Sequence, residues 1–338
     1  MKKIVRGLMV ILALVYVITA SGLANAEVMQ IKPKGDKKIK IGVMDLISSI
    51  EAAANFNKRY VKRAKDRGWD LQIFDLNFNY GQAQPVMENM ITAGYDGIII
   101  NWTEPEGYKM QLKKAYDMGI PVIIIAGFKK LPGIVADFVA WNTAIAGMNA
   151  EYLAGRLQRG DKIVAAYHSS LSFAVTRFQI AKKVFDLYGI EVVQELSPTP
   201  GKDPDQDAYD SVTNVLLRDT KKEIKGIWAQ TEGYGLPAAR AARDSGRKDV
   251  IVTTGDDSPR TYEALRTIPN LKAVIGYNGN LDVYIDDLFE IFDKVFAGKA
   301  VEMNQYRGID CYLVTKENLP PRGYFYSTCG YKGRPKDF

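Results

Sequence analysis

Polar and aromatic side chains gather at the ends of short apolar runs in this 338-residue chain, and three of its four tryptophans lie at or within one turn of these points. Flat aromatic rings pack on the C–H faces of a small polyhydroxylated molecule, while amides and carboxylates exchange paired hydrogen bonds with its hydroxyls. A place in the core is the alternative for any single aromatic ring. The residues that we predict to bind a ligand are Asp45, Asn101, Trp102, Trp141, His168, Thr231, Glu232, Asp256 and Tyr277.

The apolar runs that carry these residues occur in two successive sets. Short buried runs separated by amphipathic segments predict βα units on a parallel sheet. Two sets predict an α/β fold with two doubly wound lobes, and ligands of such sheets bind beyond the carboxyl ends of the strands. In chain order the corresponding runs are Lys40–Met44 and Lys162–Ala166, Gly97–Asn101 and Gly226–Gln230, Pro121–Ala126 and Asp249–Thr254, and Phe138–Trp141 and Lys272–Gly276.

A long amphipathic helix, Asp282–Phe296, and one more strand, Tyr306–Val314, are predicted after the second set. This surplus lets the chain cross between the lobes more than once, and we expect crossovers near Asn142, Asn278 and Gly308. The predicted boundaries are 39–141 plus 279–308 for lobe 1, and 142–278 plus 309–338 for lobe 2 with a C-terminal tail.

The first 26 residues have the pattern of a cleaved signal peptide. Three basic residues precede the apolar run Leu8–Ile18, and Ala24–Ala26 fits the small-x-small cleavage rule. A membrane anchor is the alternative, but the run is shorter than the roughly 20 residues that a span requires. No cysteine follows it, so a lipid anchor is not indicated. The sequence predicts a periplasmic protein in which a polar, flexible leader, residues 27–38, precedes the fold.

Composition argues against several classes of protein. The net charge of +6 is mild, and basic residues are scattered among acidic ones, so nucleic-acid binding is not indicated. The two cysteines, Cys311 and Cys329, are candidates for a disulfide in an oxidising compartment, with two free buried thiols as the alternative. There is one histidine and no cluster with the spacing of metal ligands, so we expect neither a metal nor a cofactor.

The main enzyme motifs are absent as well. The chain has neither a Gly-x-Ser-x-Gly elbow nor a phosphate-binding Gly-Lys-Ser/Thr loop, and a Ser-His-Asp triad could use only His168. Gly233–Ala238 matches a relaxed dinucleotide fingerprint, but its position in the second set and Pro237 favour an ordinary helix start. The sequence predicts a binding protein rather than an enzyme.

Four stretches resemble the ribose-binding-like, type I periplasmic binding proteins, and the resemblance extends from about Ile39 to Leu319. It implies two lobes joined by a hinge of three crossovers, closure on a sugar or sugar derivative, and a monomer. It also implies delivery to an ABC importer, or, in some members, to a membrane receptor kinase as a ligand sensor. The stretches are Ile39–Val43, Gly94–Asn101, Ala115–Val122 and Val250–Asp256.

The family's binding residues carry over unevenly. Asn101 and Asp256 match positions that contact sugar hydroxyls in sugar-binding members. Many sugar binders have an Asp-Arg pair where Ala126-Gly127 stands here, which predicts a ligand with one uncharged or apolar edge. Other positions also depart from the family pattern: Ser48-Ser49-Ile50-Glu51 in the first loop, Thr231-Glu232 in place of Asn-Asp, and Tyr277 in place of Gln.

Overall fold

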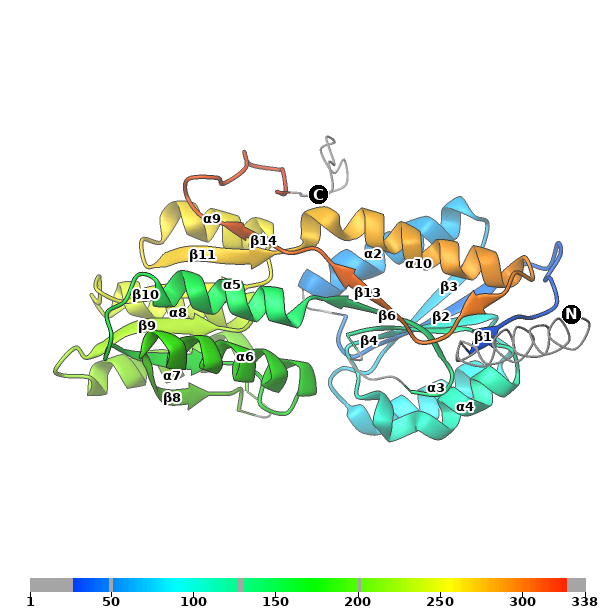
Figure 1. Ribbon diagram of the computed structural model, residues 1–338, viewed down its shortest axis with the longest axis horizontal. Coiled ribbons are helices and arrows are strands. Elements are labelled where there is room, and N and C mark those ends of the chain that lie inside the picture. Colours follow the sequence, from blue (N-terminus) through cyan, green and yellow to red (C-terminus); the bar gives the residue numbers. More distant parts are fainter. Residues whose placement is uncertain (1–26, 49–50, 127–130, 200–201, 327–338) are drawn as a thin grey trace, which may run out of the picture.

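The computed structural model describes residues 27–48, 51–126, 131–199 and 202–326. Two α/β lobes lie side by side along the long axis of the molecule (Figure 1). The predicted fold class is therefore confirmed. The predicted signal peptide lies outside the described residues, as do Gly127 and Cys329. None of the helices in the described ranges combines the length and apolar character needed to cross a membrane.

Lobe 1 is built on a six-stranded parallel sheet with helices on both faces. Helices α2 (Glu51–Asp66) and α10 (Leu281–Phe296) cover one face, and α3 (Ala83–Thr92) and α4 (Lys109–Asp117) cover the other (Figure 1). The apolar residues Phe56, Tyr60 and Ala64 recur every four residues along α2, so they share the buried side of this helix. The strands in sheet order are β13 (Gln305–Ile309), β6 (Ile134–Ala140), β5 (Val122–Ile125), β4 (Gly97–Asn101), β2 (Lys40–Asp45) and β3 (Asp70–Asp75).

Lobe 2 repeats this plan. Its strands in sheet order are β14 (Tyr312–Val314), β11 (Leu271–Gly276), β10 (Ile251–Gly255), β9 (Ile224–Ala229), β7 (Lys162–Ala166) and β8 (Glu191–Leu196), and only β14 is antiparallel. The four pairs of runs identified in the sequence occupy equivalent places in the two sheets, which confirms the repeat. Helices α5 (Asn142–Ala154) and α6 (Ser172–Tyr188) cover one face, and α7 (Pro204–Arg218), α8 (Glu232–Asp244) and α9 (Pro259–Thr267) cover the other.

The chain passes between the two sheets three times: from β6 to α5, from β11 to α10, and from β13 to β14. The third passage corrects the prediction of one final strand at Tyr306–Val314. That segment forms β13, which pairs with β6 in lobe 1, and then β14, which pairs with β11 in lobe 2. The two strands are separated at Asp310 and Cys311 because their hydrogen-bonding partners belong to different lobes.

The leader is packed against lobe 1, which corrects the expectation of a flexible segment. Strand β1 (Val28–Met29) pairs antiparallel with β12 (Val301–Glu302). Lys37 Nζ lies 2.8 Å from Asp96 Oδ1, and Lys34 Nζ lies 3.1 Å from the same atom. Asp96 is almost fully buried, so two ammonium groups of the leader compensate its charge.

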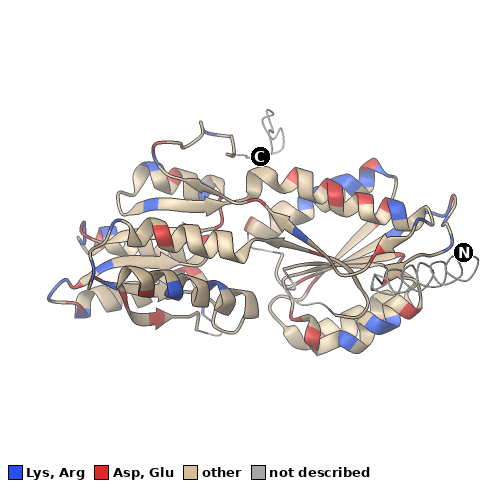
Figure 2. Cartoon of the chain, in the orientation of Figure 1, with Lys and Arg blue, Asp and Glu red and all other residues tan. Residues whose placement is uncertain are grey.

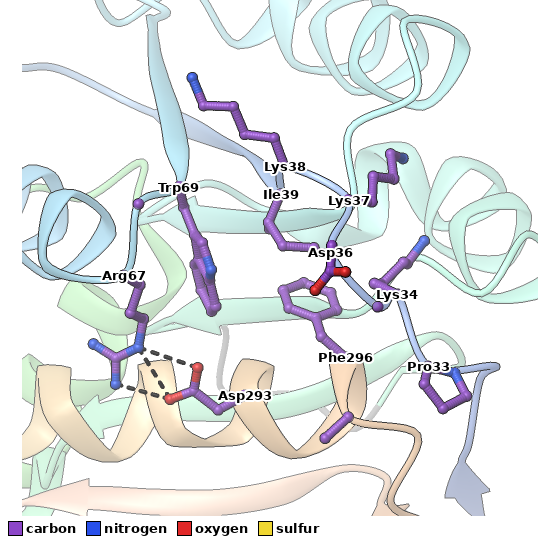
Figure 3. Close-up of a pocket in the computed structure, with 13 residues that line it drawn as sticks. Pro33, Lys34, Asp36, Lys37, Lys38, Ile39, Arg67, Trp69, Asp293 and Phe296 are labelled. Atoms are coloured by element: carbon purple, nitrogen blue, oxygen red, sulfur yellow. Dashed lines mark hydrogen bonds and ion pairs between the residues drawn. The ribbon is translucent and has the colours of Figure 1, made fainter.

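A surface pocket of about 570 Å³ lies between the leader and α10 (Figure 3). Trp69 and Phe296 line it, and Arg67 Nη2 pairs with Asp293 Oδ2 at 2.9 Å beside them. The lining residues Ile39 and Trp69 come directly before β2 and β3, so the pocket belongs to the amino ends of the strands. Ligands of open α/β sheets bind at the carboxyl ends, and the pocket is therefore not the predicted site.

Charged side chains of both signs are interspersed over the two lobes (Figure 2). Many are paired on the outer faces of helices, as Lys113 and Asp117 are on α4 and Lys182 and Asp186 on α6. Along the described ribbon, positions of Lys and Arg alternate with positions of Asp and Glu, unlike the clustered basic residues that nucleic-acid binding requires (Figure 2).

Candidate ligand-binding site

Two fully buried polar side chains end the central strands of lobe 1. Asp45 ends β2 and Asn101 ends β4, and the sheet register places them side by side. Asp45 Oδ2 accepts hydrogen bonds from Asn57 Nδ2 at 2.5 Å and Ser48 Oγ at 2.9 Å, and Asn101 Oδ1 accepts one from the Tyr60 hydroxyl at 3.0 Å. Burial raises the pKa of Asp45. Asp45 Oδ1 and Asn101 Nδ2 have no partner among the described residues, so one acceptor and one donor are left for a bound molecule.

Trp102 links the two lobes. It follows β4 with a φ of 53°, so the chain turns sharply at the strand end. Its indole meets the ring of Phe56 edge-on, with centroids 5.2 Å apart, and it also packs against the apolar cluster of lobe 2. Leu46, from the neighbouring loop, joins the same cluster as Leu171 and Phe178 of lobe 2. The strand ends of lobe 1 therefore pack directly on lobe 2.

The strand ends of lobe 2 form a charged group around Asp256. This residue follows β10 with a φ of 61° and is 8% exposed. Burial raises its pKa, while the charge of Arg177 and a hydrogen bond from Tyr277 oppose the rise. Tyr277 comes directly after β11, and burial raises its pKa well above the usual value. Arg177 is itself buried, and its Nε donates to Asn142 Oδ1 at 2.9 Å. Asp256 Oδ1 has no partner in the described part of the chain.

A second carboxylate, Glu232, lies close to Asp256. Thr231 precedes α8 and Glu232 is its first residue; both are partly buried. Ser258 Oγ donates to Glu232 Oε2 at 2.5 Å. The pKa of Glu232 rises to about 7, mainly through burial and further through the charges of Glu51 and Asp256. Glu51 begins α2 of lobe 1, so its carboxylate reaches this group from the opposite lobe.

Two further contacts join the lobes. Glu104 of lobe 1 accepts hydrogen bonds from Ser172 at the start of α6, from the backbone N–H at 2.9 Å and from Oγ at 3.0 Å. His168 stacks on Phe78 of lobe 1 with ring centroids 6.0 Å apart, and its Nδ1 lies 3.0 Å from Ser170 Oγ. Burial lowers the pKa of His168, which favours the neutral imidazole. Together these contacts describe a closed arrangement of the two lobes.

Trp141 lies against the hinge strand β13. Its ring is 5.3 Å from that of Tyr306, and a Cβ atom placed on Gly308 would lie 1.7 Å from the indole. The nearby thiol of Cys311 is held by burial at a pKa of about 12, and it has no disulfide partner among the described residues. The predicted bridge to Cys329 thus falls outside them.

Five of the predicted residues lie in two groups. Asp45 lies beside Asn101, and Asp256 lies near Glu232 and Tyr277. The predicted ligand-binding residues do not include Glu51, Glu104 or Arg177. Glu104 follows the end of β4 by three residues and Glu51 begins the helix after β2, so both lie just beyond strand ends, where they could have been sought.

Two alternative site types find no support in the geometry. The glycines of the dinucleotide-like motif lie within helix α8, and a Cβ on Gly235 would come 2.3 Å from Thr254, so the segment is a helix packed on a strand and not a phosphate-binding loop. Within the described ranges, no group of three or more His, Cys, Asp or Glu side chains is placed to hold a metal ion.

Two lobes of the same strand order, with polar residues at the facing strand ends, define a two-lobed binding protein. Residues 43–280 match the periplasmic binding protein domain family, and the chain belongs to this family. The family resemblance seen in the sequence is therefore confirmed, and the family consists of substrate-binding proteins that are not enzymes.

The relatives named here align with most of the length of the chain. The ribose import binding protein of Salmonella typhimurium is 24% identical over 264 residues, which cover 76% of this chain and 83% of the relative. A putative rhizopine-binding protein of Rhizobium meliloti is 29% identical over 269 residues, covering 75% and 82%. The 5-methylthioribose transporter solute binding protein of Thermotoga lettingae, solved with 5-methylthioribose, has a TM-score of 0.76 and 16% identity over 84% of this chain and 88% of that chain. This likeness shows a common fold.

Proposed function

We propose that this protein is an exported receptor that encloses a small sugar or sugar derivative between its lobes and delivers it to an ABC importer. One observation carries the proposal: Asp45 Oδ1, Asn101 Nδ2 and Asp256 Oδ1 are buried at strand ends without hydrogen-bond partners in the described residues. Leaving such a group unpaired costs about 1–3 kcal/mol. A ligand rich in hydroxyls supplies both donors and acceptors to these atoms.

The relatives support the same function. Their names include ribose import and 5-methylthioribose transport, so a sugar-like ligand and an ABC importer as the membrane partner are the simplest extension to this chain. Neither name mentions a receptor kinase, so these names do not support the alternative of a sensor that works with one. The proposal also includes cleavage of residues 1–26 and a monomeric receptor in the periplasm. Its lobes are residues 39–141 plus 279–308 and residues 142–278 plus 309–338.

The proposed site combines residues of both lobes. Asn101 and Asp256 are its polar anchors, and Trp102 supplies an aromatic wall where the lobes meet. The free group of Asn101 is its Nδ2 donor, because Tyr60 already bonds Oδ1. Ala126, the last described residue before this corner, carries no charge, which suits an uncharged or apolar edge of the ligand. The other proposed contributors are Asp45, Trp141, His168, Thr231, Glu232 and Tyr277.

A thermal-shift screen with sugars, polyols, nucleosides and amino acids tests this function. A ligand present at 100 times its dissociation constant should add roughly 2.7 kcal/mol to the free energy of unfolding. The same ligand should reduce the radius of gyration in solution scattering, because the lobes close by a hinge. A positive thermal shift with amino acids alone would contradict the sugar class. An unchanged scattering profile at saturation would contradict closure. N-terminal sequencing of the exported protein should begin near Glu27.

A further inference from the structure

Two carboxylates from opposite lobes converge on one serine. Glu232 of lobe 2 accepts from Ser258 Oγ at 2.5 Å, and Glu51 of lobe 1 lies close enough to Ser258 for the serine to lower the pKa of Glu51. Burial raises the pKa of both carboxyl groups, and each lies close enough to a further carboxylate to be affected by its charge. A serine hydroxyl has a single proton to donate. It cannot satisfy two carboxylates, and two like charges held together in a desolvated place repel each other.

Asp256 provides a third carboxylate near Glu232. Asp256 is more than nine-tenths buried, its Oδ1 lacks a partner among the described residues, and its charge acts on Glu232. Neighbouring Asp257 adds negative charge, but its carboxylate is already bonded by the hydroxyls of Tyr262 and Tyr312, each at 2.7 Å. Asp257 is therefore part of the framework, whereas Asp256 has bonding capacity left for a ligand.

Among the described residues, the positive charges near this group are fewer than its carboxylates. Arg177 is buried, and its charge opposes the rise in the pKa of Asp256, so this one guanidinium compensates one carboxylate. Arg260 acts on Glu232 and on Glu51, yet its side chain is 61% exposed and also lies 3.8 Å from Asp205. Water screens such an exposed charge strongly. In the described part of the chain, three carboxylates, Glu51, Glu232 and Asp256, thus lie near one buried guanidinium, Arg177.

We infer that the ligand carries a protonated amine in addition to its hydroxyls, and that this amine lies between Glu51, Glu232 and Asp256; the inference rests on the proposed function. An ammonium group has three N–H donors and no acceptor, so it can bond more than one carboxylate oxygen at once. It also removes their mutual repulsion, and hydrogen bonds between ionised partners are about twice as strong as neutral ones. The ligand class is therefore an amino sugar or amino polyol.

Matched ligands test the inference by calorimetry at pH 7.5. The probes are D-glucosamine, D-galactosamine and glucamine, each compared with the hydroxyl compound of the same skeleton, together with the N-acetyl forms of the two hexosamines. The amine should bind about ten- to a hundredfold more tightly than the matched neutral compound, and acetylation should abolish the difference. If neutral sugars bind and close the lobes as tightly as the amines do, the inference is overturned and the proposed function stands. If neither kind binds, both are overturned.

Charge-removing variants provide the second test. Glu51→Gln and Glu232→Gln each keep a side-chain oxygen that can accept from Ser258, so the fold should be retained. Each should weaken amine binding about ten- to a hundredfold more than it weakens binding of the neutral analogue, and a retained cooperative melting transition verifies folding. Glu290→Gln, on the outer surface of α10 beside Lys294, is the matched control and should bind both compounds like the wild type. Equal losses for amine and neutral ligand in the cleft variants would overturn the inference.

Discussion

Replacing Glu232 by Gln should make the unliganded protein more stable at neutral and alkaline pH. The pKa of Glu232 rises from its ordinary value of 4.5 to about 7 in the folded state. Between these values the unfolded chain releases the proton while the folded protein retains it, so the free energy of unfolding falls as pH rises. A difference of 2.5 pKa units at about 1.36 kcal/mol per unit corresponds to about 3 kcal/mol. The Gln side chain stays neutral and still accepts from Ser258.

Urea denaturation of both proteins between pH 4.5 and 8 measures this effect. Burial also raises the pKa of Asp45, Glu51 and Asp256, so both proteins should lose stability with pH. The difference between them isolates Glu232 and should grow by about 3 kcal/mol in favour of Glu232→Gln across this range. The denaturant slope should be the same in both, as expected when only stability changes. Glu290→Gln should follow the wild type. Parallel wild-type and Glu232→Gln curves would refute the reasoning.

Three other predictions concern the cleft, the hinge and the tail. Asp256→Asn, which keeps a residue type that tolerates the positive φ, should weaken ligand binding about ten- to a hundredfold in calorimetry; wild-type affinity would exclude Asp256 from the site. Gly308→Ala should displace the Trp141 ring, lower stability by about 1–3 kcal/mol and alter closure in solution scattering; an unchanged melting temperature and scattering profile would contradict this packing. Cys311 and Cys329 should form a disulfide worth about 3 kcal/mol, and two free thiols in non-reducing mass spectrometry would contradict it.

Buried strands are the part of this fold that the sequence predicts best. Gly97–Asn101 and Lys162–Ala166 have the same bounds in the structure as in the prediction. Both are short runs bounded by glycine or polar residues, and this local pattern is enough to mark a strand. The order of the strands could also be inferred, because the second set repeats the first and each strand joins its neighbours through short right-handed units.

Contacts between distant segments could not be predicted in the same way. Asn101 is predicted as a ligand-binding residue, but nothing in the local sequence indicates that its Oδ1 is bonded by Tyr60, 41 residues away. Glu51 reaches the carboxylates of lobe 2 only because the lobes close, and no periodicity in α2 indicates this. The division between β13 and β14 has the same origin, since β13 pairs with β6 of lobe 1 and β14 pairs with β11 of lobe 2. Local pattern gives the elements, whereas these contacts depend on how the elements assemble.

The contacts between the lobes act in opposite directions on closure. Glu104 with Ser172, and the stacked rings of Phe78 and His168, favour the closed arrangement. The approach of Glu51 to the carboxylates of lobe 2 opposes it, because like charges are brought together in a place that excludes water. A ligand shifts such an equilibrium only by binding one state better than the other. A cation between the carboxylates would remove this repulsion between the lobes, whereas a neutral sugar would leave it in place. The same acidic group would then both select the ligand and restrict closure to the protein that has bound it.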